Sequence, residues 1–185
     1  MSTNDQILYD GKFLRVLRRG DWEFVSRRNV TGIVGIIAVT SDGKLLLVEQ
    51  YRPPLAKNVI EIPAGLAGDV AGSEHEALEA AARRELLEET GYEAQHLHEV
   101  AQGASSAGLC DEMITLFVAH NLMRKHENAR GDGSENITLH EIPLDQVQSW
   151  IAQRIAQGAQ VDLKVYAALH FAQLKLAQNH TSHQT

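Results

Sequence analysis

Three carboxylates and an arginine crowd into the short segment Arg84-Glu85-Leu86-Leu87-Glu88-Glu89. At 3.6 residues per turn, Glu85 and Glu89 lie on the same face of a helix, with Glu88 beside them. Like charges at this spacing cost roughly 0.2–0.5 kcal/mol per pair, and the negative end of the helix dipole adds to that cost. A divalent cation would reverse the effect, because Mg²⁺ binds carboxylates together with water and substrate phosphates. The alternative interpretation is a solvated acidic face.

The residues around the acidic segment predict the helix that presents it. Ser73 and Glu76 have the spacing of a capping box, which predicts that the helix begins at Ser73. From Ala77 to Thr90 the segment is rich in Ala and Leu and contains no Gly or Pro, and Gly91 is placed to cap its C-terminus. Such a helix buries Ala and Leu on one side and presents the glutamates on another.

The spacing of these residues resembles the signature of the Nudix hydrolases. In that signature a Glu is followed, after seven residues, by Arg-Glu-apolar-x-Glu-Glu-x-Gly-apolar, and the stretch from Glu76 through Arg84 to Tyr92 matches it. Val70 stands where the signature calls for Gly, and its natural counterpart is Gly65. This departure implies about five extra residues in the loop before the helix, where added length costs little free energy.

Further segments resemble the ADP-ribose (ADP-sugar) pyrophosphatase branch of that family, although Ala107 stands where the branch usually has Pro. These segments are residues 22–25, 49–54, 61–65 and 106–112. The resemblance implies Mg²⁺-dependent hydrolysis of the diphosphate bond of ADP-ribose or a related ADP-sugar to AMP and a sugar phosphate. The alternatives are a hydrolase that prefers GDP-mannose or an oxidised nucleoside diphosphate, and a non-catalytic Nudix-fold regulator that binds a nucleotide.

For the metal, we expect Glu85 and Glu89 to be the principal ligands, with Glu88 assisting. The resemblance adds the backbone carbonyl of Ala64. We expect more than one Mg²⁺, because paired ions stabilise both the attacking and the leaving oxygen, and Mn²⁺ as a substitute. His96 and His98 alternate on a predicted strand without a third ligand, which argues against zinc.

The catalytic set is expected to comprise Glu112, Glu88 and Arg84. A carboxylate outside the metal cluster is the natural base for the attacking water, and Glu112 is the best candidate. Asp111 is the alternative base. The non-catalytic alternative is that the residue is simply an exposed acid in a loop. Arg84 is expected to orient the carboxylates through ion pairs. Which phosphorus is attacked stays open.

Four residues are expected to bind the substrate: Trp22, Arg52, Arg27 and Ala107. Trp22 offers a stacking face for adenine, with a buried core tryptophan as the alternative. Arg52 precedes Pro53-Pro54 and is suited to hold a phosphate with its guanidinium fork. Arg27 is a weaker phosphate candidate, and Ala107 lies in a loop expected to influence substrate choice. Trp150 is expected in the core.

Composition agrees with a single enzyme domain. The chain has 185 residues, of which 44% are hydrophobic and 22% charged, as in ordinary globular proteins. The net charge of −7 argues against nucleic acid as a partner. Cys110 is the single cysteine, which suits a reducing cytosol, and no His lies close enough in sequence to favour it as a nucleophile. With no signal pattern and no apolar run of membrane-spanning length, we expect a cytoplasmic protein without a membrane partner.

Hydrophobic periodicity predicts an α+β fold. Hairpins are expected at Gly20-Asp21 and at Ser41-Asp42-Gly43, and a Gly-rich loop after Ile62. The predicted strands are 13–18, 22–27, 31–40, 44–51, 59–62, 92–100, 113–119 and 137–142, and helices are predicted over 144–157 and 162–178, with an exposed loop over 125–136.

The family resemblance implies a Nudix α/β/α sandwich with a mixed sheet, preceded by a small N-terminal antiparallel β subdomain. We therefore expect residues 1–30 to form a β-hairpin region for dimerisation and substrate contact, 31–178 to form the Nudix hydrolase domain, and 179–185 to form a flexible tail. The resemblance also implies a homodimer in which the N-terminal strands exchange and each active site borrows residues from its neighbour.

Overall fold

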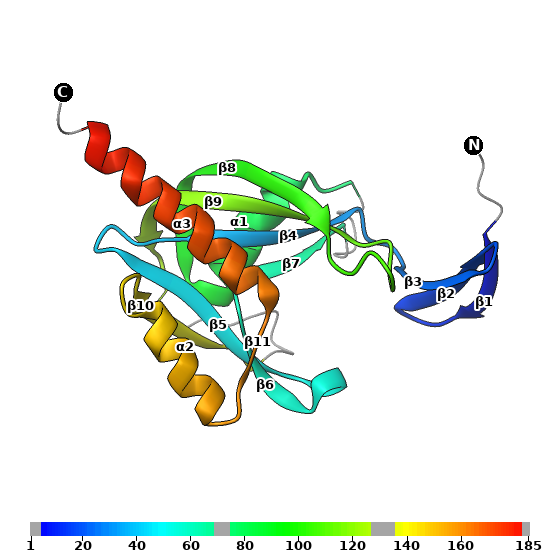
Figure 1. The fold of residues 1–185 in the computed structure, drawn as a ribbon. Coiled ribbons are helices and arrows are strands. Elements are labelled where there is room, and N and C mark those ends of the chain that lie inside the picture. The colour runs from blue at the N-terminus through cyan, green and yellow to red at the C-terminus, as the bar shows by residue number, and fades with distance from the viewer. Residues whose placement is uncertain (1–4, 69–74, 127–135, 183–185) are drawn as a thin grey trace.

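An antiparallel sheet of three strands begins the fold. A computed structural model describes residues 5–68, 75–126 and 136–182, and in it β1 (Gln6–Asp10), β2 (Leu14–Arg19) and β3 (Trp22–Arg27) pair in that order. Gly20, with a φ of 61°, makes the tight turn that pairs Arg19 with Trp22, which confirms the predicted hairpin. Strand β1 was not predicted. The sheet stands to one side of the main body (Figure 1).

The main body contains two mixed four-stranded sheets. In the first, the order is β10 (Thr138–Pro143), β5 (Lys44–Arg52), β6 (Lys57–Glu61) and β11 (Gln160–Val161). In the second, it is β7 (Ala64–Ala67), β4 (Gly32–Ala38), β9 (Met113–Arg124) and β8 (Tyr92–Ala104). The parallel pairs are β6 with β11 and β4 with β9, so both sheets are mixed, as expected.

Two sequence predictions about the strands were wrong. The turn after Thr40 is present, because the Thr40 N–H donates to the Lys44 carbonyl at 2.9 Å, and Val39, just after β4, forms a bridge with Leu45 of β5. The two strands themselves belong to different sheets. All of β4 and the Leu45–Val48 part of β5 are apolar and largely buried, and such strands are stabilised when both faces of their sheet are covered. The predicted Gly-rich loop after Ile62 is in fact strand β7, which pairs with β4.

The acidic segment lies on α1 (Leu78–Thr90). The helix begins at Leu78 without a side-chain cap, so the predicted start at Ser73 was wrong, and Ser73 and Val70 themselves lie outside the described residues. Its end was predicted correctly: Gly91 has a φ of 73° and donates its N–H to the Leu87 carbonyl.

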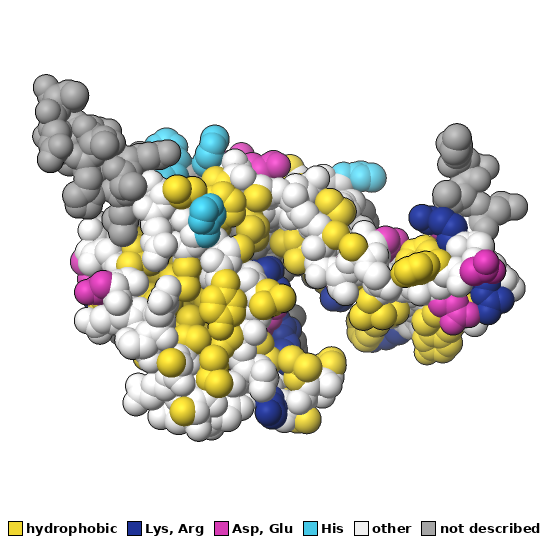
Figure 2. Space-filling view, viewed as in Figure 1, with side chains coloured by type: hydrophobic (Ala, Val, Ile, Leu, Met, Phe, Trp, Pro, Cys, Tyr) yellow, Lys and Arg dark blue, Asp and Glu magenta, His cyan; other side chains and the backbone are white. Residues whose placement is uncertain are grey.

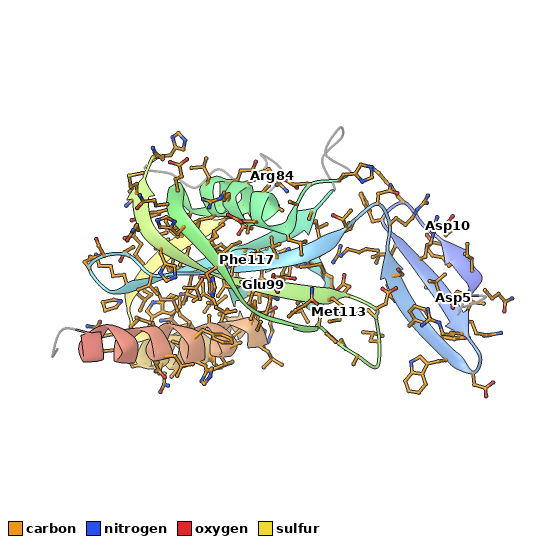
Figure 3. The ribbon with its side chains drawn as sticks, turned by 90° about the horizontal axis from the view of Figure 1, so that it is seen from above. Asp5, Asp10, Arg84, Glu99, Met113 and Phe117 are labelled. Carbon is orange, nitrogen blue, oxygen red and sulfur yellow. The ribbon has the colours of Figure 1, made fainter. Side chains whose placement is uncertain are left out.

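Helices cover both sides of the sheets. Helix α1 lies on one side, and α2 (Val147–Ala156) and α3 (Leu163–Ser182) lie on the other (Figures 1 and 3). Leu86 of α1 is fully buried in one apolar cluster, and Val165 of α3 is fully buried in a second, against which Trp150 packs. This is the expected α/β/α arrangement. Within the described parts of the chain, no helix has both the length and the apolar character to cross a membrane.

Candidate active site

A cleft of about 780 Å³ brings together residues from the N-terminal sheet, both central sheets, α1 and the start of α3. In Figure 2 the molecule is hollowed between the main body and the N-terminal sheet, with Lys and Arg side chains along the hollow. The cleft is lined by Arg27, Ile33, Arg52, Pro53, Pro54, Glu61, Ala64, Gly65, Leu66, Arg84, Glu85, Glu88, Glu89, Ser105, Glu112, Ile114, Asp162 and Lys164. Most of the site residues expected from the sequence are therefore gathered in one place.

Arg84 organises the wall of the cleft that α1 forms. One terminal nitrogen of Arg84 donates to Glu85 at 2.7 Å and to Glu88 at 3.1 Å, and the other donates to the Leu66 carbonyl at 2.9 Å. Glu76 also accepts from Arg84, at 3.2 Å. These contacts are the ones that the expected orienting role requires.

The charges on this wall stabilise one another. Burial acts to lower the pKa of Arg84, but the hydrogen bonds and charges of Glu76 and Glu85 outweigh it and raise that pKa above its usual value. The hydrogen bonds from Arg84 hold the pKa of Glu76 below its usual value. Arg84 therefore stays cationic and Glu76 stays anionic near neutral pH.

Glu85 and Glu89 are held against the strand that follows Pro63. The carboxylate of Glu89, which is only 2% exposed, accepts a 2.9 Å hydrogen bond from the N–H of Ala64. Gly65 lies directly against Glu85: a Cβ at position 65 would come within 2.0–2.5 Å of the Glu85 carboxylate atoms. A side chain at position 65 would thus displace the acidic group.

The chemistry of these donors fits a hard divalent cation. Glu85, Glu88 and Glu89 offer carboxylate oxygens on one wall of the cleft, and the absence of a Cβ at Gly65 leaves room for the Glu85 carboxylate. Within the described residues, no three or more His, Cys, Asp or Glu side chains are grouped as a metal site on their own. Carboxylate oxygens are the protein ligands that hard divalent cations prefer.

The same cleft is lined by Glu112, the expected base. Glu112 accepts from the Nε of Arg27 at 2.6 Å and from the hydroxyl of Ser105 at 3.2 Å. Arg27 was expected to contact phosphate, and here it holds the carboxylate. Asp111, the alternative base, is not among the residues that line the cleft.

The N-terminal sheet holds the loop that carries Glu112. The N–H of Val25 on β3 donates to the Leu109 carbonyl at 2.8 Å, and the N–H of Asp111 donates to the Val25 carbonyl at 3.3 Å. The loop therefore forms a single parallel bridge with β3, with Cys110 opposite Val25, and Arg27 on the same strand reaches Glu112.

A third wall contains Arg52 together with residues that the sequence analysis did not single out. The Nε of Arg52 donates to Glu61 at 2.8 Å, and the Glu61 side chain is 8% exposed. Glu61 had a sequence signal, because it is an acid at the end of an apolar strand. Asp162 and Lys164 had no sequence signal of a binding role, because in the sequence they only indicate the start of a helix.

Two expected substrate residues lie outside the cleft of their own chain. Trp22 is 60% exposed beside the turn of the β2–β3 hairpin, so the alternative of a buried core tryptophan is wrong. Ala107 is exposed in the β8–β9 loop. Neither is among the residues that line the cleft.

Comparison with known proteins identifies the family. The NUDIX domain matches residues 31–169, and the chain belongs to the Nudix family. A solved structure of an ADP compounds hydrolase superposes with a TM-score of 0.61 at 19% identity, covering 79% of this chain and 80% of that one, which confirms the fold.

Curated relatives agree with this assignment. The chain is 39% identical to the methanol dehydrogenase activator of Bacillus methanolicus, over 80% of this chain and 76% of that protein. It is 35% identical to the ADP-ribose pyrophosphatase of Bacillus subtilis, over 79% and 74%. It is 30% identical to the GDP-mannose pyrophosphatase of Yersinia pestis, over 70% and 66%. The chain is therefore a Nudix hydrolase, a family whose members generally use divalent metal ions.

Proposed function

We propose that this Nudix hydrolase cleaves the diphosphate bond of ADP-ribose or a related ADP-sugar, in a Mg²⁺-dependent reaction that yields AMP and a sugar phosphate. The observation that carries the proposal is the meeting, in one cleft, of the α1 carboxylates with Glu112 and Arg52. The relationship to the ADP-ribose pyrophosphatase of Bacillus subtilis supports the choice of substrate.

The α1 wall binds the metal in this proposal. Glu85 and Glu89 are the principal ligands, Glu88 assists, and the Ala64 carbonyl completes the protein's share. When bound there, Mg²⁺ neutralises charge on the diphosphate. Arg84 keeps the Glu85 and Glu88 carboxylates in place through its 2.7 and 3.1 Å hydrogen bonds.

Glu112 acts on the water. Its carboxylate takes a proton as the water oxygen attacks one phosphorus, and the bond from that phosphorus to the bridging oxygen breaks. Arg52 binds a phosphate oxygen by exchanging part of its contact with Glu61 for the substrate. With ADP-ribose, the products are AMP and ribose 5-phosphate.

The adenine end of the substrate requires a second copy of the chain. None of the described residues that line the cleft is aromatic, whereas Trp22 is exposed on the N-terminal sheet. That sheet and its β1–β2 connection also expose a set of large apolar side chains: Ile7, Tyr9, Phe13 and Leu14. Figure 2 shows hydrophobic side chains on the surface of this part of the molecule. Exposed apolar patches of this kind mark protein interfaces. In the proposed homodimer, Trp22 from one chain stacks on adenine in the cleft of the other.

A substrate panel tests the proposed function. Purified protein is incubated with Mg²⁺ and ADP-ribose, ADP-glucose, GDP-mannose or an oxidised nucleoside diphosphate, and products are separated by chromatography. We expect release of AMP and ribose 5-phosphate, with the highest kcat/KM for ADP-ribose. Absence of Mg²⁺-stimulated release of AMP from every ADP-sugar would refute the proposal.

A second candidate function is regulation of another protein by a bound nucleotide. The 39% identity to a protein named methanol dehydrogenase activator favours this candidate. The same panel separates the two, because a regulator without turnover binds the nucleotide and leaves it intact.

A further inference from the structure

Asp162 and Lys164 form an ion pair on the third wall of the cleft, and the proposed reaction has not used either residue. The ammonium group of Lys164 lies 2.6 Å from the Asp162 carboxylate. The Asp162 side chain is 25% exposed and the Lys164 side chain is 22% exposed, so both are partly sheltered and still open to a ligand. Both line the same cleft as the α1 carboxylates.

The pair is held in place by the backbone around it. Strand β11 pairs in parallel with β6, and the N–H of Asp162 donates to the Ile60 carbonyl at 2.9 Å. The other oxygen of the Asp162 carboxylate accepts the N–H of Lys164 at 2.7 Å, as an N-cap does. These contacts place the pair next to Glu61, which follows Ile60 and binds Arg52.

The charge of the pair indicates which part of a substrate it suits. An ammonium group beside a carboxylate is neutral overall, so it gives little attraction to a diphosphate and suits an uncharged polar group. The carboxylate accepts hydrogen bonds and the ammonium group donates them, which matches adjacent hydroxyl groups, each able to donate and accept. Pro53 and Pro54 line the same cleft and add an apolar surface for C–H groups.

Resting on the proposed function, we infer that Asp162 and Lys164 bind the hydroxyl groups of the terminal sugar and thereby make the enzyme selective for nucleoside diphosphate sugars. The sugar ring packs its C–H groups against Pro53 and Pro54, and Arg52 holds the adjoining phosphate. The pair is a specificity determinant and takes no part in bond breaking.

The test compares two substrates that differ only at the sugar. ADP-ribose carries the terminal ribose, and the β-methyl ester of ADP keeps adenosine and both phosphates but has a methyl group in its place. Lys164→Met should raise KM for ADP-ribose about tenfold with little change in kcat, the loss of roughly one charge-assisted hydrogen bond. It should leave both constants for the methyl ester unchanged.

Two further variants separate recognition from folding. Asp162→Asn removes the charge but keeps an oxygen that caps the helix, so it should show the same selective rise in KM. Lys125→Met removes an exposed lysine that pairs with Glu93 at 3.0 Å and does not line the cleft, and it should change neither substrate. Thermal unfolding of each variant reports on the fold.

Equal losses on both substrates, or no loss on either, would overturn the inference while the proposed function stands. If the wild type hydrolyses neither compound, calorimetry without metal decides instead. The inference then requires the wild type to bind ADP-ribose more tightly than the methyl ester and Lys164→Met to bind the two alike. Equal binding of both compounds by the wild type would overturn it.

Discussion

Arg27 and Glu112, 85 positions apart in the sequence, are joined by a hydrogen bond of 2.6 Å between the guanidinium Nε and a carboxylate oxygen. Arg27 belongs to the N-terminal sheet, and Glu112 ends the loop between β8 and β9. The small sheet therefore contributes to the cleft of its own chain, where it holds the proposed base in position.

Removing this contact should affect catalysis through Glu112. Glu112→Gln is expected to lower kcat by about 10²- to 10⁴-fold, the usual contribution of a general base. Arg27→Ala should lower kcat about tenfold, because the carboxylate is then less well oriented. The double variant should be no slower than Glu112→Gln alone, and additive losses would show that the two residues act separately.

Arg15→Ala is the matched control, because Arg15 forms an exposed ion pair with Asp10 on the same sheet. Steady-state kinetics on ADP-ribose should show no change for this variant. A loss in the control would indicate that the sheet, and not the Arg27 side chain, is responsible.

Glu89→Gln should lower turnover by roughly 10²-fold or more, because it removes a proposed metal ligand while keeping the shape of the side chain. The measurement is kcat as a function of Mg²⁺ concentration. In a second measurement, a chelator is added to abolish activity, and Mg²⁺ or Mn²⁺ is then added to restore it. Glu79→Gln, which changes an exposed acid on the same helix, should behave as wild type. Activity that survives complete chelation would contradict the metal-dependent mechanism.

Gly65→Ala should impair the site by steric displacement of Glu85. The new Cβ would lie 2.0–2.5 Å from the carboxylate atoms of that residue, which must then move. We expect turnover to fall about tenfold or more with a higher Mg²⁺ requirement, since misplacement by about 1 Å is enough for large losses. Gly103→Ala is the control, because a Cβ there meets no atom within 4 Å.

Glu49 should make the fold sensitive to acid. This buried carboxylate accepts from Arg154 at 2.6 and 2.7 Å, from His140 at 2.8 Å and from Asn58 at 3.2 Å. Burial acts to raise the pKa of Glu49, but these hydrogen bonds outweigh it and lower that pKa below its usual value. The stabilisation is therefore full above the unfolded pKa of about 4.3 and is lost as the pH falls through the lower folded pKa.

Glu49→Gln is expected to reduce the free energy of unfolding by about 3 kcal/mol at pH 7, because it leaves Arg154 without its partner charge. Denaturant unfolding from pH 7 down to about pH 3 should show the difference from wild type shrinking below the Glu pKa. The surface variant Glu79→Gln should cost no more than about 0.5 kcal/mol. A difference for Glu49→Gln that persists unchanged at low pH would contradict the assigned cause.

The homodimer is tested by light scattering over a dilution series. We expect a dimer at micromolar concentration, and a monomer at every concentration would refute the prediction.

Trp22→Ala should raise KM for ADP-ribose about tenfold, because stacking on a base contributes roughly 1–3 kcal/mol. Mixing Trp22→Ala chains with Glu112→Gln chains tests whether the two chains share each site. In a mixed dimer, the cleft of the Trp22→Ala chain keeps its own Glu112 and receives the intact Trp22 of the other chain, so activity should be regained.

The sequence determined the features that depend on neighbours along the chain. Helical periodicity placed Glu85, Glu88 and Glu89 on one wall, and the need for a left-handed residue placed the end of α1 at Gly91. The β2–β3 hairpin could also be predicted from the sequence, because a Gly in the turn and alternating residues in the strands are local signals.

Tertiary structure decided which distant segments meet. The divergence of β4 and β5 into separate sheets depends on what covers each face, and no local pattern carries that information. The pairings of Arg27 with Glu112 and of Arg52 with Glu61 depend on how strands and loops come together in space. Asp162 and Lys164 entered the cleft for the same reason: β11 added to β6 and carried the start of α3 to the site, a placement that long-range packing alone determines.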